Sequence, residues 1–190
     1  SGVAAIHIED QEFPKRCGHL DGKRVIPVED MVQKIRAAVD ARTDPDFTII
    51  VRTDALAVTG WDDSMRRCED YIKAGADVLF VEALRTPEEA ERATKSLGVP
   101  LLYNYVETGK SPLIPSSELE KLGFKIVIFP VSALLTICKV VTDVMKELKE
   151  KGTTSHLLGN MVNVEECFNI VGLDAMLSKD ASYTAEPQAV

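Results

Sequence analysis

The chain has 190 residues, of which 45% are hydrophobic and 27% are charged, which suits one soluble domain with a sizeable core. Its 22 basic and 30 acidic side chains give a net charge of -8, so it lacks the basic surface that binds nucleic acid. The sequence shows neither an apolar run of membrane-spanning length nor a secretion signal, so it predicts a protein of the cytoplasm or the mitochondrial matrix that binds no membrane.

Short apolar runs rich in β-branched residues alternate with stretches of helical period. The apolar runs cover residues 4–10, 48–54, 77–83, 100–106 and 125–130. The helical stretches between them include residues 29–41, 62–76 and 87–98. Thr86, Pro87 and Glu89 have the form of a capping box with proline at the first helical position. This strict alternation predicts an α/β fold with a parallel sheet covered by helices.

Polar side chains gather where each predicted strand ends. They are Glu9, Asp10, Arg52, Asp54, Glu82 and Asn104, and the last strand ends at Pro130. The carboxyl ends of parallel strands meet at one edge, where ligands bind in such folds. Helix caps or ion pairs with neighbouring loops would explain any one of these residues. The recurrence of polar or distinctive residues at the ends of all five strands favours a site.

The loop after the first predicted strand carries Cys17 among basic residues. Lys15, Arg16 and His19 flank the thiol, and Gly18 permits a tight bend. Cations near a thiol lower its pKa, which makes it able to exchange a proton near neutral pH. The other cysteines, which lie in helical patterns, are expected to be small buried apolar side chains: Cys68, Cys138 and Cys167.

Several motifs together resemble the isocitrate lyase and phosphoenolpyruvate mutase superfamily. They are IEDQEFPKRCGHLDGK, KIRAAVDAR, VRTDA, AGADVLFVEA, NYVETGKSP and LGFKIVIFP, in order between residues 3 and 152. The resemblance implies a (β/α)8 TIM-type barrel that uses Mg²⁺, or alternatively Mn²⁺, and acts on small 2-oxo or 2-hydroxy acids. Cys17 points to the short branch that contains 2-methylisocitrate lyase, 2-alkylmalate lyases and oxaloacetate hydrolase.

The resemblance also implies how the chain relates to a whole barrel. Residues 1–152 match the last five strands of eight, so the chain is expected to be part of the enzyme. The aspartates that bind the metal directly would lie in the first three strands. Residues 153–190 are expected to form a helical extension that packs on a neighbouring subunit of a dimer or tetramer. Its expected apolar stripe consists of Val164, Cys167, Phe168, Val171 and Met176.

Site residues follow from the same resemblance. It assigns catalytic roles to Cys17, His19, Arg52 and Glu82, and substrate-binding roles to Lys15, Arg16, Gly18, Arg52, Asn104 and Pro130. Glu9 would reach the metal through water, and Gly18 with His19 would belong to a gating loop. The group that removes the hydroxyl proton stays open between Glu82 and a residue outside this chain.

The expected reaction is cleavage of a 2-hydroxy di- or tricarboxylic acid, such as 2-methylisocitrate or a 2-alkylmalate. The products would be a 2-oxo acid such as pyruvate and a carboxylate such as succinate, with Cys17 as proton donor. The alternatives are an oxaloacetate hydrolase giving oxalate and acetate, and a non-catalytic interaction protein that lacks the metal aspartates. Pro130 favours the lyase, because the resembled hydrolases have serine after the last strand.

Overall fold

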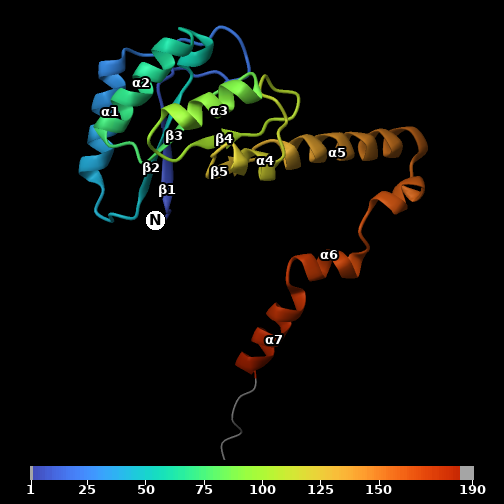
Figure 1. The fold of residues 1–190 in the computed structure, drawn as a ribbon. Coiled ribbons are helices and arrows are strands. Elements are labelled where there is room, and N and C mark those ends of the chain that lie inside the picture. The colour runs from blue at the N-terminus through green and yellow to red at the C-terminus, as the bar shows by residue number, and fades with distance from the viewer. Residues whose placement is uncertain (1, 185–190) are drawn as a thin grey trace, which may run out of the picture. The chain divides into compact units, whose positions relative to one another are not determined.

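The computed structural model describes residues 2–184, and its first part is built on five parallel strands (Figure 1). They are β1 (Ala5–Glu9), β2 (Thr48–Thr53), β3 (Val78–Val81), β4 (Leu102–Asn104) and β5 (Ile126–Ile128). β1, β2 and β3 form one sheet and β4 pairs with β5, while a parallel bridge joins Leu79 of β3 to Leu101. The predicted strands are confirmed, and each strand pairing is parallel.

A helix follows each strand, as the alternation in the sequence predicts. The helices are α1 (Val28–Ala41), α2 (Trp61–Ala74), α3 (Pro87–Ser96), α4 (Ser116–Lys121) and α5 (Ser132–Lys151), with a 3-10 turn, η1 (Ala55–Ala57), before α2. The predicted start of α3 is confirmed, because Thr86 Oγ1 accepts a hydrogen bond from the backbone N–H of Glu89 at 3.1 Å. The Glu89 carboxylate accepts at 2.7 Å from the N–H of Arg85.

The strands separate two apolar clusters of different size. Ile49 and Val51 belong to the larger cluster, together with Met31 of α1 and Tyr71 of α2. Ile50, which lies between them in the chain, belongs to the smaller cluster. That cluster consists of Ile50, Val78, Phe80 and Leu102. Because side chains alternate along a strand, one face of the sheet packs against the helices and the other, here called the inner face, leads to the polar strand ends.

From Leu135 to the last described residue, Thr184, the chain belongs to a second compact unit. It holds most of α5, the 3-10 helix η2 (Ser155–Asn160), α6 (Val164–Ile170) and α7 (Leu173–Thr184). α6 and α7 are separate helices because the chain turns at Gly172, where φ is +76°. The predicted apolar stripe is therefore divided between two helices, and its members Val164, Phe168, Val171 and Met176 are exposed. No helix within residues 2–184 is long and apolar enough to cross a membrane.

The prediction that the three helical cysteines are buried is correct for one of them. Cys68 of α2 faces the core, and burial raises the pKa of its thiol well above the ordinary value. For Cys138 and Cys167 the prediction is wrong, because both are exposed. They lie on α5 and α6, in which no residue is buried. Helical periodicity identified these helices without indicating what covers them.

Candidate active site

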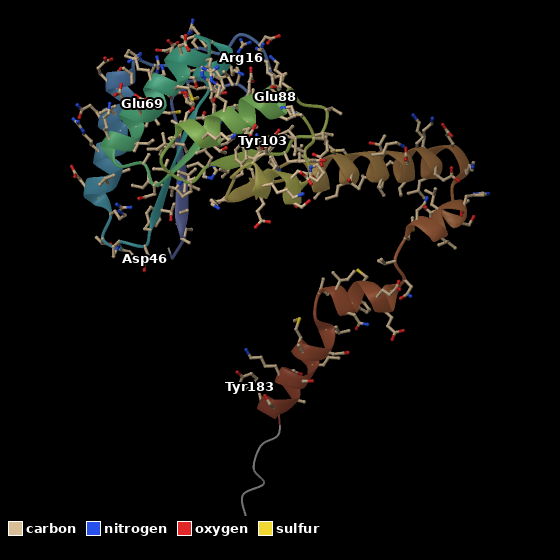
Figure 2. The ribbon with its side chains drawn as sticks, viewed as in Figure 1. Arg16, Asp46, Glu69, Glu88, Tyr103 and Tyr183 are labelled. Atoms are coloured by element: carbon tan, nitrogen blue, oxygen red, sulfur yellow. The ribbon has the colours of Figure 1, made fainter. Side chains whose placement is uncertain are left out.

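Four polar side chains lie at the carboxyl ends of neighbouring strands. They are Glu9 of β1, Arg52 of β2, Glu82 just after β3 and Asn104 of β4. Each stands two residues beyond a residue of the inner face, so the period of a strand places all four on that face. Figure 2 shows Arg16, in the loop after β1, at this end of the strands and Asp46, before β2, at the opposite end.

Glu82 connects the other polar side chains. Its Oε2 accepts a hydrogen bond from Asn104 Nδ2 at 3.1 Å and lies 3.0 Å from Arg52 Nη2, and its Oε1 accepts from the N–H of Ala83 at 2.8 Å. Burial alone raises the pKa of Glu82, but the contact with His19 and the charge of Arg52 outweigh burial, so the pKa lies below its ordinary value. An ionised carboxylate with both oxygens engaged is suited to holding its neighbours in place.

Arg52 is oriented by a second carboxylate. Its Nε donates to Asp54 Oδ2 at 2.8 Å and its Nη2 donates to Asp54 Oδ1 at 3.1 Å, which is a bidentate pair. Asp54 is fully buried. This pairing fixes the plane of the guanidinium, so Arg52 can bind a ligand carboxylate without first being ordered.

Asp10 joins the end of β1 to the end of β2. Its Oδ1 accepts from the backbone N–H of Asp54 at 2.9 Å, and its Oδ2 accepts from the hydroxyls of Thr53 at 2.7 Å and Tyr71 at 2.9 Å. Burial raises the pKa of Asp10, against the effect of these hydrogen bonds. Asp10 and Asp54 are thus used within the protein rather than facing a ligand.

The two ends of the loop of residues 11–25 lie side by side. Gln11 and Val25 form an antiparallel bridge at its base. Inside the loop, the Gln11 amide donates to the carbonyl of Arg16 at 2.8 Å and accepts from the N–H of Arg16 at 2.9 Å. These contacts give the loop an internal framework, so the segment around Cys17 has a defined path.

The tip of the loop rests on the polar strand ends. Gly18 lies against Arg52 and Glu82, and a Cβ atom at this position would stand 2.6 Å from Glu82 Cδ. The Nδ1 of His19 accepts a hydrogen bond from the backbone N–H of Lys110 at 2.8 Å. The ring proton of His19 is therefore inferred to be on Nε2, which lies 3.2 Å from Glu82 Oε1.

A cavity of about 300 Å³ opens between this loop and the strand ends. It is lined by His7, Lys15, Cys17, Gly18, His19, Arg52, Phe80, Glu82, Asn104, Val106, Ile128, Pro130 and Val131. One part of this lining carries charged and polar groups, and the other part is apolar. Such a cavity suits a small acid that has both a carboxylate and a hydrocarbon part.

The cavity brings together most of the residues that the sequence analysis placed in a site. The exceptions, which do not line it, are Asp10 and Asp54, which are buried within the protein, and Arg16 and Glu9. Arg16 Nη1 lies near Gly22 of the same loop. Glu9 Oε2 accepts from Lys15 Nζ at 2.7 Å and lies 3.5 Å from Arg52 Nε, so it lies beside the cavity rather than in its lining.

Sequence reasoning missed the apolar and aromatic lining of the cavity. The missed residues are His7, Phe80, Val106, Ile128 and Val131. Strand alternation would have found His7, which stands two residues before Glu9 on the same strand. Burial and the charge of Arg52 lower the pKa of His7, which favours its neutral form. Val131 lies in a connection between a strand and a helix, where no periodic pattern applies.

Glu9 also retains an acceptor that could serve a metal ion. Its Oε1 is buried and makes no hydrogen bond within residues 2–184. A metal-bound water could donate to this oxygen, so the residue fits an outer position at a Mg²⁺ site. Within the same residues, no group of three or more His, Cys, Asp or Glu side chains is arranged to hold a metal directly.

The fold and site define an α/β protein with a cavity, lined by charged and apolar side chains, at the carboxyl ends of parallel strands. Residues 1–149 match the family described as phosphoenolpyruvate phosphomutase, and the chain belongs to the phosphoenolpyruvate mutase/isocitrate lyase superfamily. It is 39% identical to 2,3-dimethylmalate lyase of Eubacterium barkeri over 183 residues, and 41% identical to 2-methylisocitrate lyase of Aeropyrum pernix over 188 residues. These alignments cover 96% and 99% of this chain, but 63% and 60% of the two relatives.

Solved structures give the same result for the fold. A crystal structure of 2,3-dimethylmalate lyase matches with a TM-score of 0.88 at 39% identity, over 100% of this chain and 64% of that one. A structure of oxaloacetate acetylhydrolase with 3,3-difluorooxalacetate matches with a TM-score of 0.89 at 35% identity, over 97% and 63%. Phosphonopyruvate hydrolase, solved with oxalate and Mg²⁺, matches with a TM-score of 0.79 at 28% identity, over 96% and 63%. The chain therefore forms part of a (β/α)8 barrel.

Proposed function

We propose that this chain is part of a magnesium-dependent carbon-carbon lyase that cleaves a small 2-hydroxy di- or tricarboxylic acid. The main support is that Cys17 lines the same cavity as Arg52, Glu82 and Asn104. A proton donor, a carboxylate-binding cation and a polar amide are the groups that such a cleavage needs. The lyase names of relatives at 39% and 41% identity support the same reaction class.

Each of these residues is proposed to have a separate role in the reaction. Arg52 binds a substrate carboxylate and stabilises the charge that builds up on it. Asn104 Oδ1 is buried and makes no hydrogen bond within residues 2–184, so it can accept one from the 2-hydroxyl of the substrate. A base removes this hydroxyl proton, and the bond between C2 and C3 breaks with its electron pair left on C3. Cys17 then donates its thiol proton to C3, which completes the carboxylate product.

Glu9 would hold the metal ion through water, by the buried oxygen described above. Mg²⁺, when bound, supplies positive charge that stabilises developing negative charge on oxygen. Glu82 is proposed to hold Arg52, His19 and Asn104 in place, because its lowered pKa makes it a weak base.

The apolar part of the cavity favours an acid that carries an alkyl group. Val106, Ile128 and Pro130 offer no charge or hydrogen-bond donor side chain to a further carboxylate. Burial of a methyl or similar substituent against these side chains would contribute favourably to the binding free energy. The proposed substrates are therefore 2-methylisocitrate or a 2-alkylmalate, each of which carries such a group.

Hydrolysis of oxaloacetate to oxalate and acetate is the second candidate. The similarity to oxaloacetate acetylhydrolase, at a TM-score of 0.89, favours it. Oxaloacetate lacks an alkyl substituent, so it would leave the apolar wall of the cavity without a hydrocarbon partner. The lyase reaction is therefore preferred.

A substrate panel tests the proposal on the full-length protein that contains this chain. The protein is incubated with Mg²⁺ and 2-methylisocitrate, 2,3-dimethylmalate or oxaloacetate, and pyruvate, succinate, propionate and oxalate are measured. Pyruvate is expected from one of the first two acids, and chelation of the metal is expected to abolish its formation. Oxalate alone would support the hydrolase, and a folded protein that converts no acid of this class would support the non-catalytic alternative.

A further inference from the structure

We infer that Lys23 is a positioning residue, which holds the Cys17 segment of the loop in register with Arg52. This inference rests on the proposed function, because it assigns the loop a place in that site. Lys23 does not line the cavity and would touch no ligand there. Its effect would pass through two neighbours, Gly18 and Asp54.

The burial of Lys23 is the first observation. Its side chain is 2% exposed, although an ammonium group loses strong hydration when it leaves water. A buried ammonium is retained only where charged or polar partners replace the water. Lys23 Nζ donates to the carbonyl oxygen of Gly18, and it lies 3.7 Å from Oδ1 of the fully buried Asp54.

The path of the chain brings this lysine inward. Gly22, directly before Lys23, has a φ of +78°, in the left-handed region that favours glycine. The turn stands near the base of the loop, next to the bridge between Gln11 and Val25. From there the Lys23 side chain reaches back to the loop tip. Its hydrogen bond to the Gly18 carbonyl therefore links the base of the loop to its tip.

The two partners of Lys23 belong to different parts of the site. The Gly18 carbonyl is part of the peptide group that links Gly18 to His19. Gly18 directly follows Cys17 in the chain. Asp54 is the carboxylate that fixes the plane of Arg52. The Lys23 ammonium group therefore connects two parts of the site. One is the segment that carries Cys17, and the other is Asp54, which orients Arg52.

Lys23→Met in the full-length protein tests the inference kinetically, because methionine keeps much of the length without the charge. We expect kcat to fall about 10- to 100-fold, since misplacement of a reacting group by about 1 Å can cost this much. KM should change less than about threefold, because Lys23 touches no substrate. Lys34→Met, at an exposed position on α1, is the matched control and should keep the parental kcat.

Alkylation of Cys17 gives a readout that does not depend on turnover. Iodoacetamide labelling of the Cys17 peptide is followed by mass spectrometry, with and without oxalate and Mg²⁺. Oxalate should slow labelling of the parent and of Lys34→Met, and it should give little protection to Lys23→Met. This arm tests Lys23 even if the parent converts none of the proposed acids, so the two proposals can fail separately.

Lys23→Gln is the second variant, because it is polar and less disruptive in a buried place. Its amide is too short to keep both contacts, so it should also lose protection and turnover. Parental kcat and protection in either folded variant would overturn the inference. If circular dichroism showed that neither variant folds, Lys23 would be required for folding itself. The positioning role would then be rejected.

Discussion

Gly18 lies so close to Glu82 that a Cβ atom at position 18 would stand 2.6 Å from Glu82 Cδ. Real Cβ atoms do not approach other carbons at this distance, so any side chain at position 18 must move the loop or the carboxylate. Glu82 has little freedom to move, because Arg52, Asn104 and His19 all contact it. The loop is the part that must give way.

Gly18→Ala in the full-length protein should therefore displace Cys17 and lower kcat/KM by about 100-fold. The free energy of unfolding should change little, because the loop can move outward into solvent. Gly98→Ala is the control, since a Cβ atom there meets nothing within 4 Å and should leave kcat/KM unchanged. Parental kcat/KM in Gly18→Ala would show that the closed loop is not the active arrangement.

Stability at acid pH should depend measurably on Asp63 of α2. Burial alone raises the pKa of Asp63, but hydrogen bonds from Thr59, Arg67 and Arg66 outweigh it and lower the pKa to about 2. Because the folded pKa lies below the unfolded value of 3.8, this carboxylate stabilises the fold above pH 3.8. That stabilisation is lost as the pH falls toward 2, since the unfolded state then binds the proton more tightly.

Urea unfolding of the parent and of Asp63→Asn at pH 5 and pH 3 checks this prediction. The parent should lose more stability than the variant between these two pH values, by at most about 1 kcal/mol, because solvent near Asp63 screens its ion pairs. Asp62→Asn, which replaces the neighbouring carboxylate in the first turn of α2, serves as the control and should follow the parent. Equal pH dependence of parent and Asp63→Asn would contradict the assignment.

The strands were predictable because β-branched runs and polar strand ends are local signals. Glu82 and Asn104 could be placed in one site for the same reason, since each ends a strand of a parallel sheet. Loop positions were harder, because side-chain direction within a loop follows no period. The sequence thus placed Arg16 in the site and left out Lys23, because nothing in the sequence distinguishes the two lysines and two arginines of this loop from one another.

Burial in the second unit was not predictable from the sequence. The periodicity of α5 and α6 indicated amphipathic helices, and an apolar stripe normally packs against something. The structure shows Cys138 and Cys167 exposed, so these helices do not bury their apolar residues within the described chain. A local pattern shows that a helix has an apolar face without identifying its partner.

We expect the exposed apolar residues of α6 to contact a second copy of the chain. Light scattering of the full-length protein should then give the mass of a dimer or tetramer. Val164 and Phe168, which are 70% and 47% exposed, stand four residues apart on one side of α6. Changing both to aspartate should lower the mass, whereas Lys179→Asp on α7 should not. A monomeric mass for the parent would exclude this assembly.

Cys17→Ser in the full-length protein tests the proposed proton donor directly. Serine has nearly the size of cysteine, so the loop and the substrate KM should stay close to those of the parent. Turnover should fall by about 10²- to 10⁴-fold, because a hydroxyl is a far weaker acid than a thiol and positioned acid catalysis is worth this much. Cys138→Ser, at an exposed site outside the cavity, should keep the parental rate and so exclude general thiol damage. If Cys17→Ser turned over at the parental rate, Cys17 would only line the cavity, and the proton would have to come from another group.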